Sequence, residues 1–86
     1  MASTILVMDN DLLALESLES YLKQAGYTVV TASSAREAVE QAKGTSCNAA
    51  LLDMKMPEMD GFQVAAMLRQ LQPDLRVIIF TGYASL

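Results

Sequence analysis

Two short apolar runs that each stop at an acidic residue constrain this 86-residue chain more than any other feature. Thr4–Met8 leads directly into Asp9, and Ala49–Leu52 leads directly into Asp53. Runs of this length without polar interruption are typical of strands that are covered on both faces in a parallel sheet. The chain must therefore supply helices for both faces.

Helical patterns do separate the strands. The apolar spacing predicts a first helix over 12–25, and Gly26 suits its end. A Ser-x-x-Glu capping signal at Ser34 opens a second helix that ends at Gly44. A third helix follows Gly61 and ends before Pro73. The residues expected to face inward are Leu15, Leu18, Tyr21, Leu22, Ala25, Ala38, Val39, Ala42, Phe62, Val64, Ala65, Leu68 and Leu71.

Short β-branched segments at 27–32 and 76–81 complete an alternation of four strands and three helices. This alternation predicts an α/β fold, a doubly wound parallel sheet with helices on both faces. In sheets of the flavodoxin-like type the spatial order begins 2-1-3-4, and ligands bind where the chain reverses direction. Asp9, Asn10 and Asp53 would meet there, with Thr81 arriving from the fourth strand.

Converging carboxylates repel each other unless a cation lies between them. A hard divalent ion with oxygen ligands, most naturally Mg²⁺, would relieve that repulsion. Beside such an ion one carboxylate can attack a phosphoryl group. Asp53 lies in the middle of the rim and is the expected nucleophile, and Thr81 supplies a hydroxyl for the phosphoryl oxygens.

Structural explanations compete with these roles. Asp53 could be a solvated turn residue, and Asp9 and Asn10 could cap the helix that begins near Leu12. Asp11 is expected at a helix start, where the helix dipole favours an acid, although it could also assist a metal. Pro57, Asp60 and Gly61 are expected to be structural loop residues: Asp60 caps the third helix, and Gly61 permits the turn of the loop.

Composition narrows the class of protein. The net charge of −4 argues against nucleic-acid binding by this segment. Cys47 is the one cysteine, which suits a reducing compartment, and no apolar run reaches the length of a membrane span. We therefore expect a cytoplasmic location without membrane attachment. The sequence contains no His, so no histidine base, ligand or phosphocarrier is present.

At three places the sequence resembles the receiver domain of response regulators in two-component systems, a CheY-like fold. The places are ILVMDND, LLDMKMPEMDGF and VIIFTGYAS, and the second is the most specific. The resemblance implies that Asp53 is the phosphoacceptor and that Thr81 is the switch hydroxyl. It also implies that Asp9, Asn10, Asp53 and the backbone carbonyl of Lys55 bind the metal.

Two departures from the family pattern matter. Asn10 replaces the second acid of the family's pair, so Mg²⁺ should be weakly held. The family has a fifth strand and further helices, so we expect residues 1–86 to be a truncated receiver domain with impaired phosphoryl chemistry. The fourth strand would then form a sheet edge, and a homo-oligomer, most simply a dimer, would cover it. The side chains involved would be Val77, Ile78, Ile79 and Phe80.

The resemblance implies a signalling module that takes phosphoryl groups from a sensor histidine kinase or a phosphotransfer protein. The alternative is an interaction module that self-associates without being phosphorylated. An aspartyl phosphatase is a third hypothesis, but that class has a second acid two residues after the nucleophile, where this chain has Lys55. We therefore expect a phosphoacceptor and not an enzyme.

Overall fold

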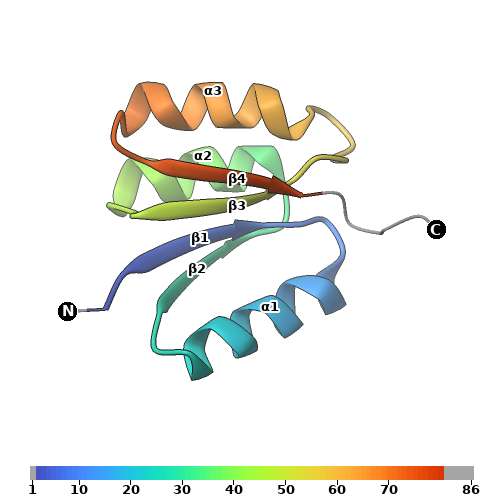
Figure 1. The fold of residues 1–86 in the computed structure, drawn as a ribbon. Coiled ribbons are helices and arrows are strands. Elements are labelled where there is room, and N and C mark those ends of the chain that lie inside the picture. Colours follow the sequence, from blue (N-terminus) through green and yellow to red (C-terminus); the bar gives the residue numbers. More distant parts are fainter. Residues whose placement is uncertain (1, 81–86) are drawn as a thin grey trace.

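The computed structural model describes residues 2–80 and contains one four-stranded parallel sheet (Figure 1). The strands are β1 (Thr4–Met8), β2 (Thr28–Ala32), β3 (Ala49–Asp53) and β4 (Arg76–Phe80). Their order across the sheet is β2-β1-β3-β4. The predicted doubly wound α/β fold with order 2-1-3-4 is therefore confirmed.

Three helices cover the sheet in two layers. They are α1 (Leu12–Gln24), α2 (Ala35–Gly44) and α3 (Gly61–Leu71). Helix α1 lies on one face of the sheet, whereas α2 and α3 lie side by side on the other (Figure 1). No helix in the described part of the chain is long and apolar enough to cross a membrane.

Local capping interactions explain where the helices begin and end. The Asp11 carboxylate accepts hydrogen bonds from two backbone N–H groups in the first turn of α1. Gly26 follows that helix with φ of 101°, a conformation that a residue with a side chain rarely adopts. The Ser34 hydroxyl accepts from the backbone N–H of Glu37 at the start of α2. These contacts confirm Asp11 as a helix-start residue.

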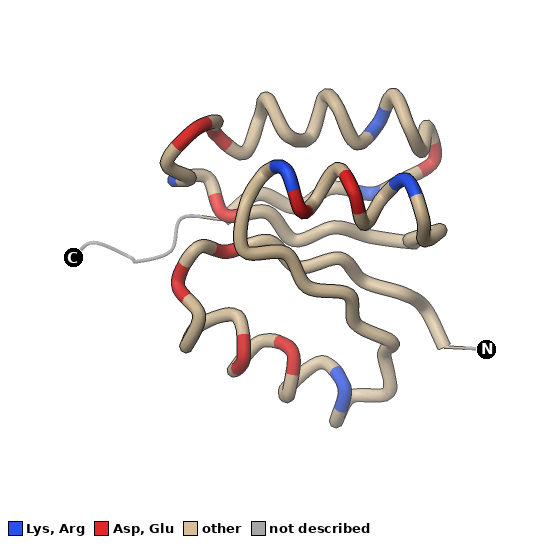
Figure 2. Tube along the Cα trace, turned by 180° about the vertical axis from the view of Figure 1, so that it is seen from behind, with Lys and Arg blue, Asp and Glu red and all other residues tan. Residues whose placement is uncertain are grey.

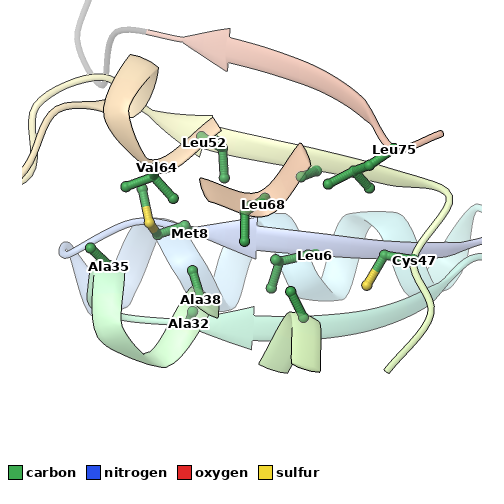
Figure 3. Packing of buried hydrophobic residues seen from close by; sticks show 12 residues of the cluster. Leu6, Met8, Ala32, Ala35, Ala38, Cys47, Leu52, Val64, Leu68 and Leu75 are labelled. Atoms are coloured by element: carbon green, nitrogen blue, oxygen red, sulfur yellow. The ribbon is translucent and has the colours of Figure 1, made fainter. Parts of the chain in front are cut away.

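The main core lies between the sheet and the α2–α3 layer. Figure 3 shows Leu6, Met8, Leu52, Val64 and Leu68 converging there, and all five are fully buried. A smaller cluster lies beneath α1. Its buried members are Ile5, Val7 and Leu15.

The inward faces of the helices were predicted only in part. Val64, Leu68, Ala38 and Ala42 are buried as expected. The prediction was wrong for four other residues, because Tyr21 is 72% exposed, Phe62 is 60% exposed, and Ala25 and Leu71 are also exposed. Each lies at the margin of its apolar stripe, and spacing alone does not tell which margin residues meet the sheet.

The fourth strand is covered more than the sequence suggested. Val77 and Ile79 pack against the main core, on the side that α3 covers. Ile78 points to the opposite face and is 56% exposed. The expectation that the whole of Val77–Phe80 would be uncovered was therefore wrong, because packing on the α3 side partly buries alternate residues of this strand.

Candidate functional site

The carboxyl ends of β1 and β3 bring Asp9 and Asp53 to one rim of the sheet. Met8 and Leu52 are partners in the pairing of these strands, and each aspartate is the next residue along. Asp9 is 3% exposed and Asp53 is 4% exposed. No other charged residue within 2–80 is buried to this degree. Adjacent buried carboxylates are costly, which is typical of a functional site.

Backbone groups fix the orientation of both carboxylates. The backbone N–H of Asp11 donates to Asp9 Oδ1 at 2.9 Å, and that of Lys55 donates to Asp53 Oδ1 at 3.1 Å. The backbone N–H of Asp9 donates to the carbonyl of Ala32 on β2. Because the loops after both strands contribute these donors, the two side chains cannot turn away from the rim without losing hydrogen bonds.

The environment raises the pKa of the Asp9 carboxyl above its ordinary value. Burial is the largest cause, because it disfavours the charged form. The negative charge of Asp53 and a side-chain hydrogen bond to Asp53 raise the pKa further, whereas the bond from Asp11 lowers it. The two carboxyl groups are therefore close enough to interact directly.

The residues at this rim suit a hard divalent cation. Asp9 and Asp53 would supply two carboxylates that need a positive charge between them. Asn10 and Lys55 are exposed on the adjoining loops and would add a neutral amide oxygen and a backbone carbonyl. Within residues 2–80 no group of three or more His, Cys, Asp or Glu side chains is arranged to hold a metal. A cation here would thus depend on the two carboxylates and on neutral oxygens.

The sequence placed two further residues, Asp11 and Thr81, beside the site. The Asp11 carboxylate is engaged as the N-cap of α1, accepting from Leu13 and Ala14. That role leaves metal assistance by Asp11 without support. Thr81, the expected switch hydroxyl, lies outside the residues that the structure describes.

In the loop between β3 and α3 the helix cap is as predicted, but Gly61 is needed for a different reason than expected. The Asp60 side chain accepts from Gln63 N, and the Gln63 side chain accepts from Asp60 N, so the predicted cap is confirmed as a full capping box. Pro57 is exposed in this loop. Gly61 does not have a positive φ, so the expectation that it permits a turn was wrong. It is buried against the end of β3 instead.

Acidic residues gather at the rim. Figure 2 shows red segments from several loops at the end of the sheet where the strands finish, with few blue segments among them. The loops after β1 and β3 carry Asp9, Asp11, Glu58 and Asp60, against the single basic residue Lys55. This surplus of negative charge would favour the approach of a metal cation.

Comparison with known proteins agrees with this arrangement. The family model described as response regulator receiver domain matches residues 5–86. The transcriptional regulatory protein ZraR of Escherichia coli (strain K12) is 37% identical over 81 residues, which cover 94% of this chain and 18% of ZraR. The response regulator protein TodT of Pseudomonas putida is 32% identical over 85 residues, which cover 99% of this chain and 37% of TodT.

Solved structures share the fold. A CheY-like receiver domain protein from Methanospirillum hungatei JF-1 matches with a TM-score of 0.91 and 35% identity over all of this chain and 69% of that one. TrrA from Thermotoga maritima, solved in complex with Mg²⁺-BeF, matches with a TM-score of 0.86 and 30% identity over 95% of this chain and 71% of that one. The chain thus spans less than two fifths of these two curated relatives. On these grounds the chain belongs to the family of response regulator receiver domains of two-component systems.

Proposed function

We propose that Asp53 accepts a phosphoryl group from a sensor histidine kinase or a phosphotransfer protein. The observation that carries this proposal is the buried pair of Asp9 and Asp53 at the rim where β1 and β3 end. Two neighbouring buried carboxylates can share a bound cation. One of them can then act as the nucleophile toward a phosphoryl group, because the cation offsets the negative charge of both partners. The membership of the receiver family supports the same assignment.

The transfer needs little from the protein beyond position. A carboxylate oxygen of Asp53 attacks phosphorus, the P–N bond to the donor imidazole breaks, and its electron pair stays on that nitrogen. The backbone N–H of Lys55, which holds Asp53 Oδ1, orients the nucleophile. Asp9, Asn10, Asp53 and the Lys55 carbonyl would hold Mg²⁺, which supplies neutralisation of the phosphoryl oxygens when bound. Thr81 is proposed to contact those oxygens through its hydroxyl.

A small phosphodonor tests this function directly. Incubation with acetyl phosphate and Mg²⁺ should add one phosphoryl group, detected as a mass shift of the intact protein that maps to Asp53. The Asp53→Asn variant should show no shift, because its amide is not a nucleophile. Omission of Mg²⁺ should slow the reaction. An unchanged mass for the unmodified protein at high donor concentration would contradict the proposal.

We also propose that the chain is not an enzyme toward external phosphomonoesters. A phosphatase with an aspartyl nucleophile needs an acid to protonate the leaving group. Two residues after Asp53 this chain has Lys55, which is exposed, where that class of phosphatase has its carboxylic acid. Steady turnover of an alkyl phosphomonoester such as glycerol phosphate, whose leaving group needs that proton, would contradict this expectation if it depended on Asp53.

A second candidate is self-association through β4, supported by a groove beside that strand. The groove has a volume of about 690 Å³, and its apolar floor includes Ile5, Leu51 and Ile78. In the described sheet β4 pairs only with β3, so its other edge has no strand partner within residues 2–80. An uncovered strand edge beside apolar side chains favours pairing with another chain.

Charges around the groove favour a second copy as the occupant. Asp74 and Arg76 both line the groove, and within residues 2–80 neither forms an ion pair. Residues of opposite charge on one surface allow a two-fold pairing in which Asp74 of one copy faces Arg76 of the other. Sedimentation velocity should then show a dimer that dissociates on dilution. A single monomeric species across the micromolar range would exclude this candidate without affecting the phosphoacceptor proposal.

A further inference from the structure

Gly61, the first residue of α3, lies directly against the strand end that carries the phosphoacceptor. It is buried, and its backbone N–H donates to the carbonyl oxygen of Met54 at 3.1 Å. Met54 is the residue after Asp53, and its own N–H donates to the carbonyl oxygen of Phe80 at 2.7 Å. One short backbone segment is thus held between α3 on one side and β4 on the other.

A side chain at this position would be tightly crowded. A Cβ added to Gly61 would lie 3.1 Å from the carbonyl oxygen of Asp53, 3.1 Å from Cα of Met54 and 3.1 Å from Cγ2 of Ile79. Such distances are shorter than ordinary van der Waals contacts, so a neighbour has to move by a few tenths of an ångström. Two of the three atoms belong to the backbone at Asp53 and Met54, and backbone cannot rotate out of the way as a side chain can.

The helix is poorly able to absorb the displacement. Val64 and Leu68 of α3 are fully buried in the main core, and the Asp60–Gln63 capping box fixes the first turn. Moving α3 outward would open cavities around both core residues. Part of the strain therefore falls on the end of β3, whose backbone atoms are two of the three close neighbours, and any shift there moves Asp53 relative to Asp9.

We propose that Gly61 is a positioning residue for phosphoryl transfer, which sets the placement of Asp53 relative to Asp9. This inference rests on the proposed phosphoacceptor function and deepens it. Reactions that depend on aligned groups lose much of their rate when one group moves by about 1 Å, up to roughly a hundredfold. A displacement of a few tenths of an ångström should therefore reduce both the affinity for Mg²⁺ and the rate of phosphorylation.

The test compares Gly61→Ala with Gly44→Ala. Gly44 ends α2, and nothing lies within 4 Å of a Cβ added there, so this control adds the same methyl group without a contact. Each protein is titrated with Mg²⁺ while the amide signals of Asp9 and Asp53 are followed by NMR. The initial rate of phosphorylation by acetyl phosphate is then measured at saturating Mg²⁺.

Gly61→Ala should phosphorylate about tenfold more slowly at saturating Mg²⁺ and bind Mg²⁺ more weakly, while it still unfolds cooperatively. Gly44→Ala should match the unmodified protein in both measurements. Equal rates and equal Mg²⁺ affinities for Gly61→Ala and the unmodified protein would overturn the inference. Such a result would leave the proposed function intact, since the unmodified protein would still be phosphorylated.

A second variant keeps the inference testable if Gly61→Ala does not fold. Of the three close neighbours, only Cγ2 of Ile79 belongs to a side chain, and Ile79→Ala removes it. The double variant Gly61→Ala/Ile79→Ala therefore has more room. It should remain slower than Ile79→Ala alone, because the contacts with the Asp53 and Met54 backbone persist. Equal rates for these two variants would overturn the inference. If the unmodified protein is not phosphorylated, the Mg²⁺ titrations decide alone, and absence of Mg²⁺ binding would overturn function and inference together.

Discussion

At the scale of single residues, the functional rim contains two buried carboxylates and one amide where the family pattern has a second acid of its pair. Asp9 and Asp53 are held in place by backbone N–H groups, whereas Asn10 is exposed on the loop that follows Asp9. The amide can donate an oxygen to a cation but adds no negative charge. If the rim binds Mg²⁺ as proposed, the charge of residue 10 should affect the affinity directly.

Replacement of Asn10 by Asp should strengthen Mg²⁺ binding about tenfold, because a third carboxylate near a divalent ion contributes roughly 1–2 kcal/mol of attraction. Isothermal titration calorimetry with Mg²⁺ would measure the change. Asn48→Asp is the matched control, since it adds the same charge at the opposite end of β3. Equal affinities for the two variants would show that charge at residue 10 does not act on the site.

Replacement of Asp9 by Asn should stabilise the metal-free protein at neutral pH by about 1 kcal/mol. Burial and the neighbouring Asp53 raise the pKa of Asp9 in the folded state, so the folded state holds this proton more tightly than the unfolded state. The unmodified protein therefore loses stability as the pH rises from the unfolded pKa, near 3.8, through the folded pKa. The amide oxygen of Asn can still accept from Asp11 N.

Urea denaturation of Asp9→Asn and the unmodified protein between pH 4 and 7 would check this prediction. The variant should show a flatter dependence of its unfolding free energy on pH. Addition of Mg²⁺ should stabilise the unmodified protein more than the variant, because a ligand stabilises the state that binds it. A variant that is less stable than the unmodified protein at pH 7 without Mg²⁺ would contradict the expectation.

At the scale of elements, the side chain of Gln72, which follows α3, connects the carboxyl end of α2 to the segment that precedes β3. Gln72 Oε1 accepts from the backbone N–H of Cys47 at 2.9 Å. Gln72 Nε2 donates to the carbonyl oxygens of Ala42 and Thr45, both at 2.8 Å. A partly buried side chain with three backbone partners thus connects elements that are 25 or more residues apart.

Replacement of Gln72 by Ala should destabilise the fold by about 2–3 kcal/mol, because it leaves partly buried backbone groups without partners. Gln70→Ala is the control, since Gln70 is exposed on the same helix. Urea denaturation followed by circular dichroism would measure both. Equal midpoints for the two variants would show that water replaces these hydrogen bonds without loss. Phosphorylation of Asp53 should be little affected, because Gln72 lies at the opposite end of the sheet.

At the scale of the whole molecule, the sheet is covered unequally. Among residues 2–80, helices α2 and α3 span one face, whereas α1 covers only the β1–β2 half of the other. The groove beside β3 and β4 on that second face includes Ile78, the most exposed apolar residue of the described strands. The proposed association at this face depends on how the whole sheet is covered.

Replacement of Ile78 by Lys should shift the protein to monomer, because a charge in the groove disfavours its burial against a second copy. Sedimentation velocity at several concentrations would detect the shift. Tyr21→Lys is the control, since Tyr21 is 72% exposed on the outer surface of α1. Equal association of both variants would place the contact elsewhere. The rate of phosphorylation by a small phosphodonor should be unchanged in Ile78→Lys.

Sequence alone was sufficient for the order of elements and for the two acids at the rim. Apolar runs that end in Asp9 and Asp53 identify buried parallel strands, and parallel strands present their carboxyl ends at one edge. Caps at Asp11 and Asp60 are equally local, since both depend on bonds within three residues. These features depend on residues that are close together in the chain, so the local sequence is enough to predict them.

Tertiary structure decided everything that depends on distant parts of the chain meeting. The burial of Val77 and Ile79, the exposure of Tyr21 and Phe62, and the bridging role of Gln72 all depend on which element lies opposite. Gly61 shows the difference most clearly. The sequence suggested a glycine needed for its backbone angles, whereas packing favours one because α3, β3 and β4 would crowd a Cβ beside Asp53.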